Sequence, residues 1–479
     1  MGDSVWSKTV AIAPRKALDG NIETEAAVIG AGMAGILIAY FLQEAGKQVV
    51  ILEADRIASG QTKNTTAKIT SQHGCIYSKL KKDFGVDAAG LYAEANEEAI
   101  AEYQRIIEEN DISCRFERLP AYLYSTTDEK LLKKEAKVAA SLEISAYYSK
   151  EVKLPFGTAG AVCFENQAQF HPLEFIRQIA EDLTIYEKTK VLSVKGHCLT
   201  TNKGIVKAEH IIFATHYPIT NIPGCYFLRQ HQQRSYVLAL RNVKKVKGMY
   251  YSIDPKGLSI RMEEDILLLG GGGHRTGKGE AGKGYKFLRK AAEKYFPEHE
   301  EITSWSAQDC MPHDGLPFIG KYSILRPYWY VATGFHKWGM STSMIAAGVI
   351  RDQICGIRNP YEELFSPQRI HLKAGFTAFI KDVGTSAKGL LMGALHLPFS
   401  GVASLKPGQG KIIRIGLFRY GCYKEKNGRL HKISVRCPHM GCELEWNGQE
   451  HTWDCPCHGS RYNIDGELID NPAQVDIYL

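Results

Sequence analysis

The sequence predicts a Rossmann-like α/β body with an inserted sheet, followed by a separate all-β domain at the C-terminal end. Three observations carry this prediction. Residues 24–29 and 48–52 are short apolar segments on either side of a glycine-rich turn and an apolar helical run, as in a βαβ unit. Between residues 87 and 214, charged helical patterns give way to short β-like runs. After the turn that begins at Pro407, the chain continues as a series of short strands.

Hydrophobic periodicity locates the elements of the body. Gly46 stops the helix of the first unit. Helical patterns cover 87–109 and 128–142, and β-like runs return over 191–214. A glycine-rich turn is expected before a helix that begins near Tyr285. An inserted sheet, suited to form the wall of a substrate cavity, is expected from three strand-like segments, 235–240, 249–253 and 265–269.

Changes in pattern predict the domain boundaries. The α/β body is expected to occupy residues 1–365. Residues 366–402 are glycine-rich with helical segments but little periodicity, which indicates a linker. Residues 403–479 are expected to form the small all-β domain.

The composition, with 44% hydrophobic and 23% charged residues, is that of a globular protein. The 59 Lys and Arg are interleaved with 52 Asp and Glu, so the net charge of +7 predicts no nucleic-acid partner. The N-terminal segment lacks the apolar core of a secretory signal, which predicts a cytoplasmic location. The apolar stretch 390–402 is interrupted by Gly393 and Pro398, and no membrane span is expected.

The 12 cysteines fall into two groups. Those up to Cys355 are scattered at irregular spacings, as reduced core thiols are, and predict a reducing compartment. The others crowd into residues 422–457, where metal chemistry is expected. Cys422 lies apart from the motifs of that stretch and is interpreted as a core thiol.

The first βαβ unit carries a G-x-G-x-x-G turn that predicts a dinucleotide site. Gly30 permits a tight turn, Gly32 lets the backbone approach a pyrophosphate, and Gly35 allows close packing of helix against strand. Glu53 ends the second strand, where its carboxylate can accept hydrogen bonds from ribose hydroxyls and disfavours a 2′-phosphate. The adjoining Ala54 is assigned to the same site. The motif alone does not separate FAD from NAD, and a βαβ unit with ligand-free glycines is the alternative.

The rest of the body favours FAD. Segments 58–62 and 64–68 supply hydroxyls and amides just after the acidic strand end, including Thr65 and Thr66. Together with further segments, they resemble the FAD-dependent amino-acid and amine oxidoreductases of the D-amino-acid oxidase and glycine oxidase type. The resemblance extends over about residues 22 to 356 and implies FAD, with Thr65 and Thr66 at the cofactor. The further matching segments are QFHP at 169–172, FAT at 213–215, DGLPFIG at 314–320 and VATGF at 331–335.

A late glycine-rich turn also enters the site by this resemblance. In the family, such a turn before a helix approaches the flavin ring, and here the turn includes Gly334 and Phe335. A helix beginning near Gly339, with Met340 next to it, would aim its backbone amides at the ring. A C-capped core helix without a cofactor role is the alternative for each of these residues.

Two segments of the C-terminal domain, 437–442 and 455–460, read CPHMGC and CPCHGS. They resemble the Rieske signature at every defining position, and zinc sites rarely combine such a set of residues at these offsets. The resemblance implies a [2Fe-2S] cluster with two cysteines on one iron and two histidines on the other. The implied ligands are Cys437, Cys455, His439 and His458.

The same resemblance assigns further roles around the cluster. Cys442 and Cys457 are implied to form a disulfide between the two loops, and free thiols are the alternative. Ser460 and Tyr462 occupy positions whose hydroxyls bond cluster or ligand sulfurs and favour the reduced state. Residues 470–473 are expected to form a third loop that shields the cluster.

The combination predicts an oxidoreductase. FAD accepts two electrons as a hydride, whereas a Rieske cluster carries one at a time. We therefore expect oxidation of a small amine or amino-acid-like substrate, with electrons leaving through the cluster to an external one-electron carrier. The alternatives are an oxygen-using oxidase with a structural or redox-sensing Rieske domain, and a reductase fed through the cluster. A Rieske oxygenase fits less well, because no triad of two histidines and one carboxylate stands out at a recognisable spacing.

The sequence names no catalytic residue. An arginine would suit a substrate carboxylate, but Arg234 and Arg261 are interpreted as surface or structural residues. Cys310 is considered for covalent flavin attachment, although its offset does not match the relatives. Three histidines in family-like segments are interpreted as hydrogen-bonded structural residues, namely His171, His313 and His336.

Overall fold

The structure is a computed structural model of the 479-residue chain. It describes residues 2–278, 283–369, 375, 380, 382, 384, 401–416 and 418–479. Most of the predicted linker, 366–402, lies outside the described residues.

The first sheet of the body confirms the predicted βαβ unit. Its strand order is β16-β17-β10-β1-β2-β7, with β1 parallel to both β2 and β10. Helix α2 (Met33–Glu44) connects β1 to β2 and packs against α8 (Gly339–Cys355). The strands of this sheet are β1 (Ile22–Ile29), β2 (Val49–Leu52), β7 (Ile185–Tyr186), β8 (Val191–Lys195), β9 (Cys198–Thr201), β10 (Ile205–Phe213), β16 (Phe318–Ser323) and β17 (Arg326–Thr333).

A second sheet forms the expected insertion, with the order β15-β11-β14-β13-β12-β4-β6-β3 and β5 paired to β6. The glycine-rich turn predicted before the helix near Tyr285 does not include residues 270–275, which continue as strand because they pair with β11. The strands are β3 (Lys68–Ile69), β4 (Glu117–Ser125), β5 (Ala146–Ser149), β6 (Gly160–Gln169), β11 (Gln230–Arg241), β12 (Met249–Ser252), β13 (Ser259–Glu263), β14 (Ile266–Arg275) and β15 (Glu300–Pro312).

The remaining helices cover the sheets, and the two predicted amphipathic helices correspond to α4 and α5. No helix in the described part of the chain is long and apolar enough to cross a membrane. The α-helices are α1 (Val5–Thr9), α3 (Ile76–Asp83), α4 (Val86–Glu109), α5 (Glu129–Ala140), α6 (Pro172–Ile179), α7 (Gly284–Tyr295) and α9 (Glu362–Phe365). The short 3-10 helices are η1 (Gln61–Asn64), η2 (Tyr226–Leu228) and η3 (Val402–Ser404).

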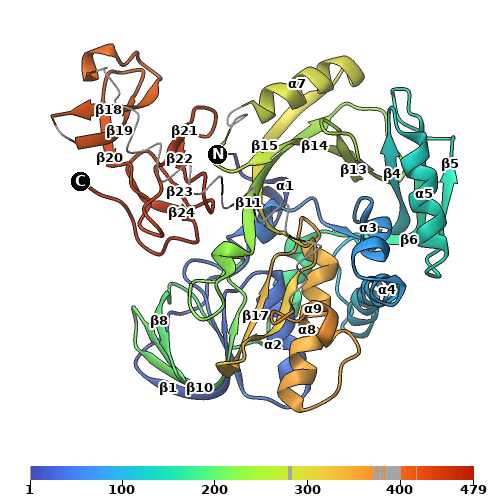
Figure 1. The fold of residues 1–479 in the computed structure, drawn as a ribbon, viewed down its shortest axis with the longest axis horizontal. Helices are drawn as coiled ribbons and strands as arrows, with labels where there is room; N and C mark the ends of the chain where they lie inside the picture. Colours follow the sequence, from blue (N-terminus) through green and yellow to red (C-terminus); the bar gives the residue numbers. More distant parts are fainter. Residues whose placement is uncertain are drawn as a thin grey trace.

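The C-terminal domain consists of two small antiparallel sheets beside β11 (Figure 1). Its own small core packs around the cysteine-containing loops. The first sheet contains β18 (Gly410–Ile415), β19 (Phe418–Lys424) and β20 (Leu430–Ser434). The second contains β21 (Glu445–Asn447), β22 (Thr452–Asp454), β23 (Arg461–Tyr462) and β24 (Leu468–Asp470).

Candidate cofactor sites and their interface

The turn after β1 is built so that only glycine fits at two positions. Gly30 has a φ of +103°, and a Cβ there would lie 2.7 Å from the carbonyl oxygen of Ala214. A Cβ on Gly35 would lie 1.9 Å from the carbonyl oxygen of Gly30. Gly32 caps α2 without a side-chain hydrogen bond, so the helix N-terminus can receive an anion. The turn therefore fits a pyrophosphate.

Glu53 lies beside this turn, at the end of β2. Its carboxylate accepts hydrogen bonds of 2.8 Å from the backbone amides of Ala31 and Asp55. Burial raises the pKa of Glu53, and these two hydrogen bonds oppose the shift. The two bonds orient the carboxylate toward the cavity that Glu53 lines.

A cavity of about 860 Å³ joins the two sheets. The structure brings nearly all of the predicted cofactor-binding residues to its wall, while Gly35 and Gly334 lie behind it. At the far end, α8 begins at Gly339 with no side-chain cap on its free amides. The predicted residues on the wall are Gly30, Gly32, Glu53, Ala54, Thr65, Thr66, Phe335, Gly339 and Met340.

The wall also carries a buried lysine. The Nζ atom of Lys68 donates hydrogen bonds to the backbone oxygen of Tyr250 at 2.8 Å and to Oγ of Ser259 at 2.7 Å. Burial, with a smaller effect of Arg261, lowers the pKa of Lys68 to about 7. Among the residues that the structure describes, no carboxylate forms an ion pair with Lys68. The cavity therefore offers an amino group that titrates near neutral pH and has no carboxylate partner among the described residues.

An acidic group lies on the same cavity wall. Asp309 of β15 lines the cavity together with Lys337. Burial raises the pKa of Asp309, whereas the positive charge of Lys337 lowers it. The cavity thus presents both a carboxyl group and amino groups to a small molecule.

The two arginines considered for substrate binding do not line the cavity. Arg261 is fully buried, donates to the backbone oxygens of Thr66 and Ala67 at 2.9 Å and forms an ion pair with Glu263. Arg234 is also buried and pairs with a residue of the C-terminal domain. These contacts agree with the structural half of their interpretation as surface or structural residues.

Protein partners are seen for the side chains of His171 and Cys310. His171 caps α6 and contacts Oγ1 of Thr9 at 2.9 Å. His336 is half-buried, and the loss of solvent around its ring lowers its pKa to about 4. Cys310 lines the cavity, its thiol lies 3.5 Å from the backbone oxygen of His216, and burial raises its pKa well above the usual value.

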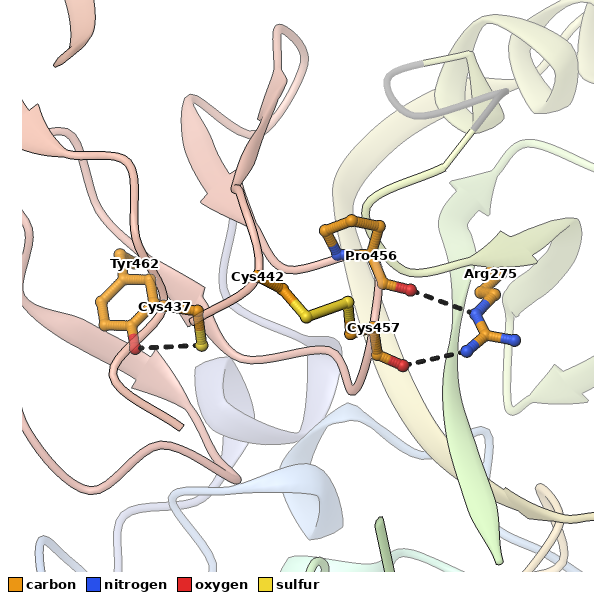
Figure 2. The surroundings of a disulfide bond; sticks show 6 residues. All are labelled: Arg275, Cys437, Cys442, Pro456, Cys457 and Tyr462. Carbon is orange, nitrogen blue, oxygen red and sulfur yellow. Dashed lines mark hydrogen bonds between the residues drawn. A yellow bond between two sulfur atoms is a disulfide. The ribbon is translucent and has the colours of Figure 1, made fainter. Parts of the chain in front are cut away.

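In the C-terminal domain, the four predicted cluster ligands converge in two pairs. The rings of His439 and His458 lie 4.8 Å apart between centroids. Hydrogen bonding to Cys455, helped by the backbone of His439 and the hydroxyls of Ser460 and Tyr462, lowers the pKa of Cys437 against the effect of burial. The hydroxyl of Tyr462 lies 3.9 Å from Sγ of Cys437 (Figure 2).

Details of this site fit a [2Fe-2S] cluster. The Nδ1 atoms of His439 and His458 are buried without a hydrogen-bond partner in the structure. The Nε2 atom of His439 instead contacts Oδ1 of Asn221 at 2.8 Å, which leaves Nδ1 as the free ligand atom. Cys442 and Cys457 form the disulfide between the two loops (Figure 2).

Hydrogen bonds join the cluster loops to the body next to the cavity. Gln308 donates to the backbone oxygen of Gly459 at 2.9 Å, and the next residue in β15 is cavity-lining Asp309. Gln232 donates to the backbone oxygens of His458 at 3.0 Å and Asn471 at 2.8 Å. The expected third loop, 470–473, contributes residues 470, 471 and 473 to the cavity wall, and the flanking residues 468, 469 and 474 also line it.

A buried ion network reinforces the interface. Arg234 of the body and Arg461 of the C-terminal domain both pair with Glu450, at 2.5 and 3.3 Å. Burial alone raises the pKa of Glu450, but the two guanidinium groups outweigh it and lower the pKa to about 2. The network stays charged at neutral pH.

Residues 25–353 match the family described as FAD dependent oxidoreductase, and residues 398–478 match the Rieske [2Fe-2S] domain. The chain belongs to the FAD-dependent oxidoreductases. This oxidoreductase carries a C-terminal Rieske domain, and its cofactors are FAD and a [2Fe-2S] cluster.

One relative resembles this FAD-dependent oxidoreductase along its whole length. The Rieske 2Fe-2S iron-sulfur protein YhfW of Bacillus subtilis (strain 168) is 36% identical, covering 98% of this chain and 96% of its own. Glycine oxidase from Geobacillus kaustophilus superimposes with a TM-score of 0.61 at 19% identity, covering 73% of this chain and 99% of its own. L-Proline dehydrogenase from P. horikoshii superimposes with a TM-score of 0.60 at 18% identity, covering 74% of this chain and 98% of its own. At these identities the solved structures show the fold of the body.

Sequence reasoning missed the side chains that connect the two sites. Gln232 and Gln308 lie in no recognisable motif. Their hydrogen bonds to the cluster loops follow only from the docking of the two domains. Lys68 is the last residue of the predicted cofactor segment 64–68, but only its neighbours Thr65 and Thr66 were assigned to the cofactor.

Proposed function

We propose that this oxidoreductase oxidises a small amine or amino-acid-like substrate at FAD and passes the electrons singly through the Rieske cluster to an external carrier. One observation carries the proposal. Gln308 holds a cluster loop by a 2.9 Å hydrogen bond, and the adjacent Asp309 lines the cofactor cavity. Neighbouring residues of β15 therefore contact the two cofactor sites, and this proximity favours electron exchange between them.

The charges in the cavity support an amino-acid-like substrate. Lys68 offers a buried cation that a substrate carboxylate would neutralise, and this pairing would offset the cost of burying the charge. Asp309 offers a carboxyl group for a substrate amine. The residues that hold and orient FAD are those of the glycine turn and Glu53, with the amides at the start of α8 near Gly339.

The two cluster loops differ in how they face solvent. Loop 455–460 is buried against the body, whereas Met440 in loop 437–442 is 43% exposed. We place the approach of the external one-electron carrier on the Met440 side. The scattered free cysteines of the body suit a reducing, cytoplasmic environment.

Turnover with different acceptors tests the proposal. A panel of glycine derivatives, D- and L-amino acids and secondary amines would be supplied with either oxygen or ferricyanide, a one-electron acceptor. We expect at least one substrate to support ferricyanide reduction faster than peroxide formation. Peroxide formation equal to substrate consumption, unaffected by ferricyanide, would contradict the proposal and favour the oxidase alternative.

A further inference from the structure

Three side chains outside both cofactor sites converge on one point. Nδ1 of His231 lies 2.8 Å from Oδ2 of Asp382, and Nε2 of His313 lies 2.6 Å from the same oxygen. The ligand atoms of the three residues all lie within 4.8 Å of one another. All three side chains are largely shielded from solvent, with exposed fractions of 18%, 8% and 12%.

The antiparallel sheet explains why the two imidazoles meet. His231 of β11 is paired with Met311 of β15, and His313 follows two residues later on the same side of the strand. The backbone amide of His313 continues the ladder by donating to the oxygen of Arg229 at 3.0 Å. The carboxylate of Asp382 comes from the chain beyond the body, so the three positions are far apart in sequence.

A fourth residue ties this cluster to the iron-sulfur domain. Arg275 forms an ion pair with Oδ1 of Asp382. The same guanidinium donates to the backbone oxygens of Pro456 at 3.2 Å and Cys457 at 2.9 Å (Figure 2). These two residues lie in the loop between the predicted ligands Cys455 and His458.

We propose that His231, His313 and Asp382 form a binding site for a divalent transition-metal ion. Two imidazoles and one carboxylate suit Fe²⁺, Co²⁺ or Zn²⁺ and leave further coordination positions for water or another small ligand. Arg275 contacts the second carboxylate oxygen and orients the first toward the two imidazoles, as outer partners of metal ligands do. A bound ion would sit between the three atoms and replace the hydrogen bonds that now join them.

The proposal is independent of the substrate chemistry at FAD. It adds a metal centre on the body side of the iron-sulfur loop, linked to that loop through one arginine side chain. The alternative is a metal-free hydrogen-bonded cluster that simply braces the interface.

Equilibrium dialysis distinguishes the metal site from a metal-free hydrogen-bonded cluster. The full-length protein with FAD and cluster bound would be treated with EDTA, desalted and dialysed against CoCl₂, with bound cobalt measured by elemental analysis. We expect one tightly bound cobalt per chain. Binding should weaken at least tenfold in His231→Ala, His313→Ala and Asp382→Asn. His210→Ala, at a half-buried histidine of β10 that contacts Tyr330, is the matched control and should bind as the unaltered protein does.

Flavin absorbance and acid-labile sulfide would show that each variant keeps its fold. A second measurement needs no variant, because paramagnetic Co²⁺ at this site should shorten the spin relaxation of the reduced Rieske cluster, whereas diamagnetic Zn²⁺ should not. Absence of stoichiometric cobalt, equal binding in all variants, or unchanged cluster relaxation at saturating Co²⁺ would each overturn the proposal.

Discussion

Replacing Lys68 by methionine tests whether the buried cation is kept for a ligand at the expense of stability. Burial lowers the pKa of Lys68 from 10.5 to about 7. At about 1.4 kcal/mol per pKa unit, charged Lys68 therefore costs about 4 to 5 kcal/mol on folding. The methionine variant loses two hydrogen bonds of Nζ, each with a net value of about 0.5 to 1.5 kcal/mol. We expect the FAD-free Lys68→Met protein to be more stable by about 1 to 4 kcal/mol at pH 7.

The stability that Lys68 contributes should rise with pH between pH 7 and 10.5. Because the folded pKa lies below the unfolded one, the unfolded chain binds more protons between pH 7 and 10.5, and stability contributed by this site rises with pH across that window. Thermal unfolding of the FAD-free protein at several pH values measures this contribution, and the rise should be smaller in Lys68→Met. Lys133→Met, at an exposed lysine, controls for loss of an amino group.

The same variant should bind carboxylates poorly. With FAD bound, benzoate serves as a small carboxylate probe, and its dissociation constant measured by calorimetry should rise at least tenfold in Lys68→Met. A less stable FAD-free variant, or unchanged benzoate binding, would contradict a role for Lys68 as a buried carboxylate-binding group.

Three further changes concern the cluster and the interface. Tyr462→Phe removes a hydroxyl next to Sγ of Cys437. A redox titration should show the cluster potential lowered by about 60 mV, equivalent to about 1.4 kcal/mol. The control Tyr423→Phe, at a tyrosine stacked on Trp446, should leave the cluster potential unchanged. Arg234→Met leaves Glu450 short of one partner and should destabilise the docked protein by about 3 to 5 kcal/mol in calorimetry, far more than Arg241→Met at an exposed site. Because the pKa of Glu450 is lowered to about 2, its stabilising contribution should be complete above about pH 4.5 and disappear as the pH falls toward 2; a flat acid profile would contradict this assignment.

Local patterns made the cofactors predictable from the sequence. The glycine turn needs its residues within one βαβ unit, and backbone contacts at Gly30 and Gly35 show why no other residue fits there. The cysteine and histidine ligands lie in two short loops whose spacing is set by the cluster itself. When all residues of a site lie in one turn or loop, their spacing in the sequence identifies the site.

Relations between distant segments were not predictable. The contact of Gln308 with Gly459 depends on how two domains dock, and no periodicity encodes docking. His231 and His313 meet because of the register between β11 and β15, which the sequence alone does not specify. The strand over 270–275 was missed because glycines usually mark turns, whereas here pairing with β11 keeps the segment extended.

The proposed function requires that electrons pass from the flavin to the cluster within one chain. Anaerobic mixing with a substrate found by turnover, followed by flavin absorbance and low-temperature EPR on the same samples, shows whether this transfer occurs. We expect flavin bleaching to be followed by the signal of a reduced Rieske cluster, more slowly in Gln308→Leu, which lacks the hydrogen bond to Gly459. Bleached flavin beside a cluster that stays oxidised, yet is reduced by dithionite, would contradict this transfer.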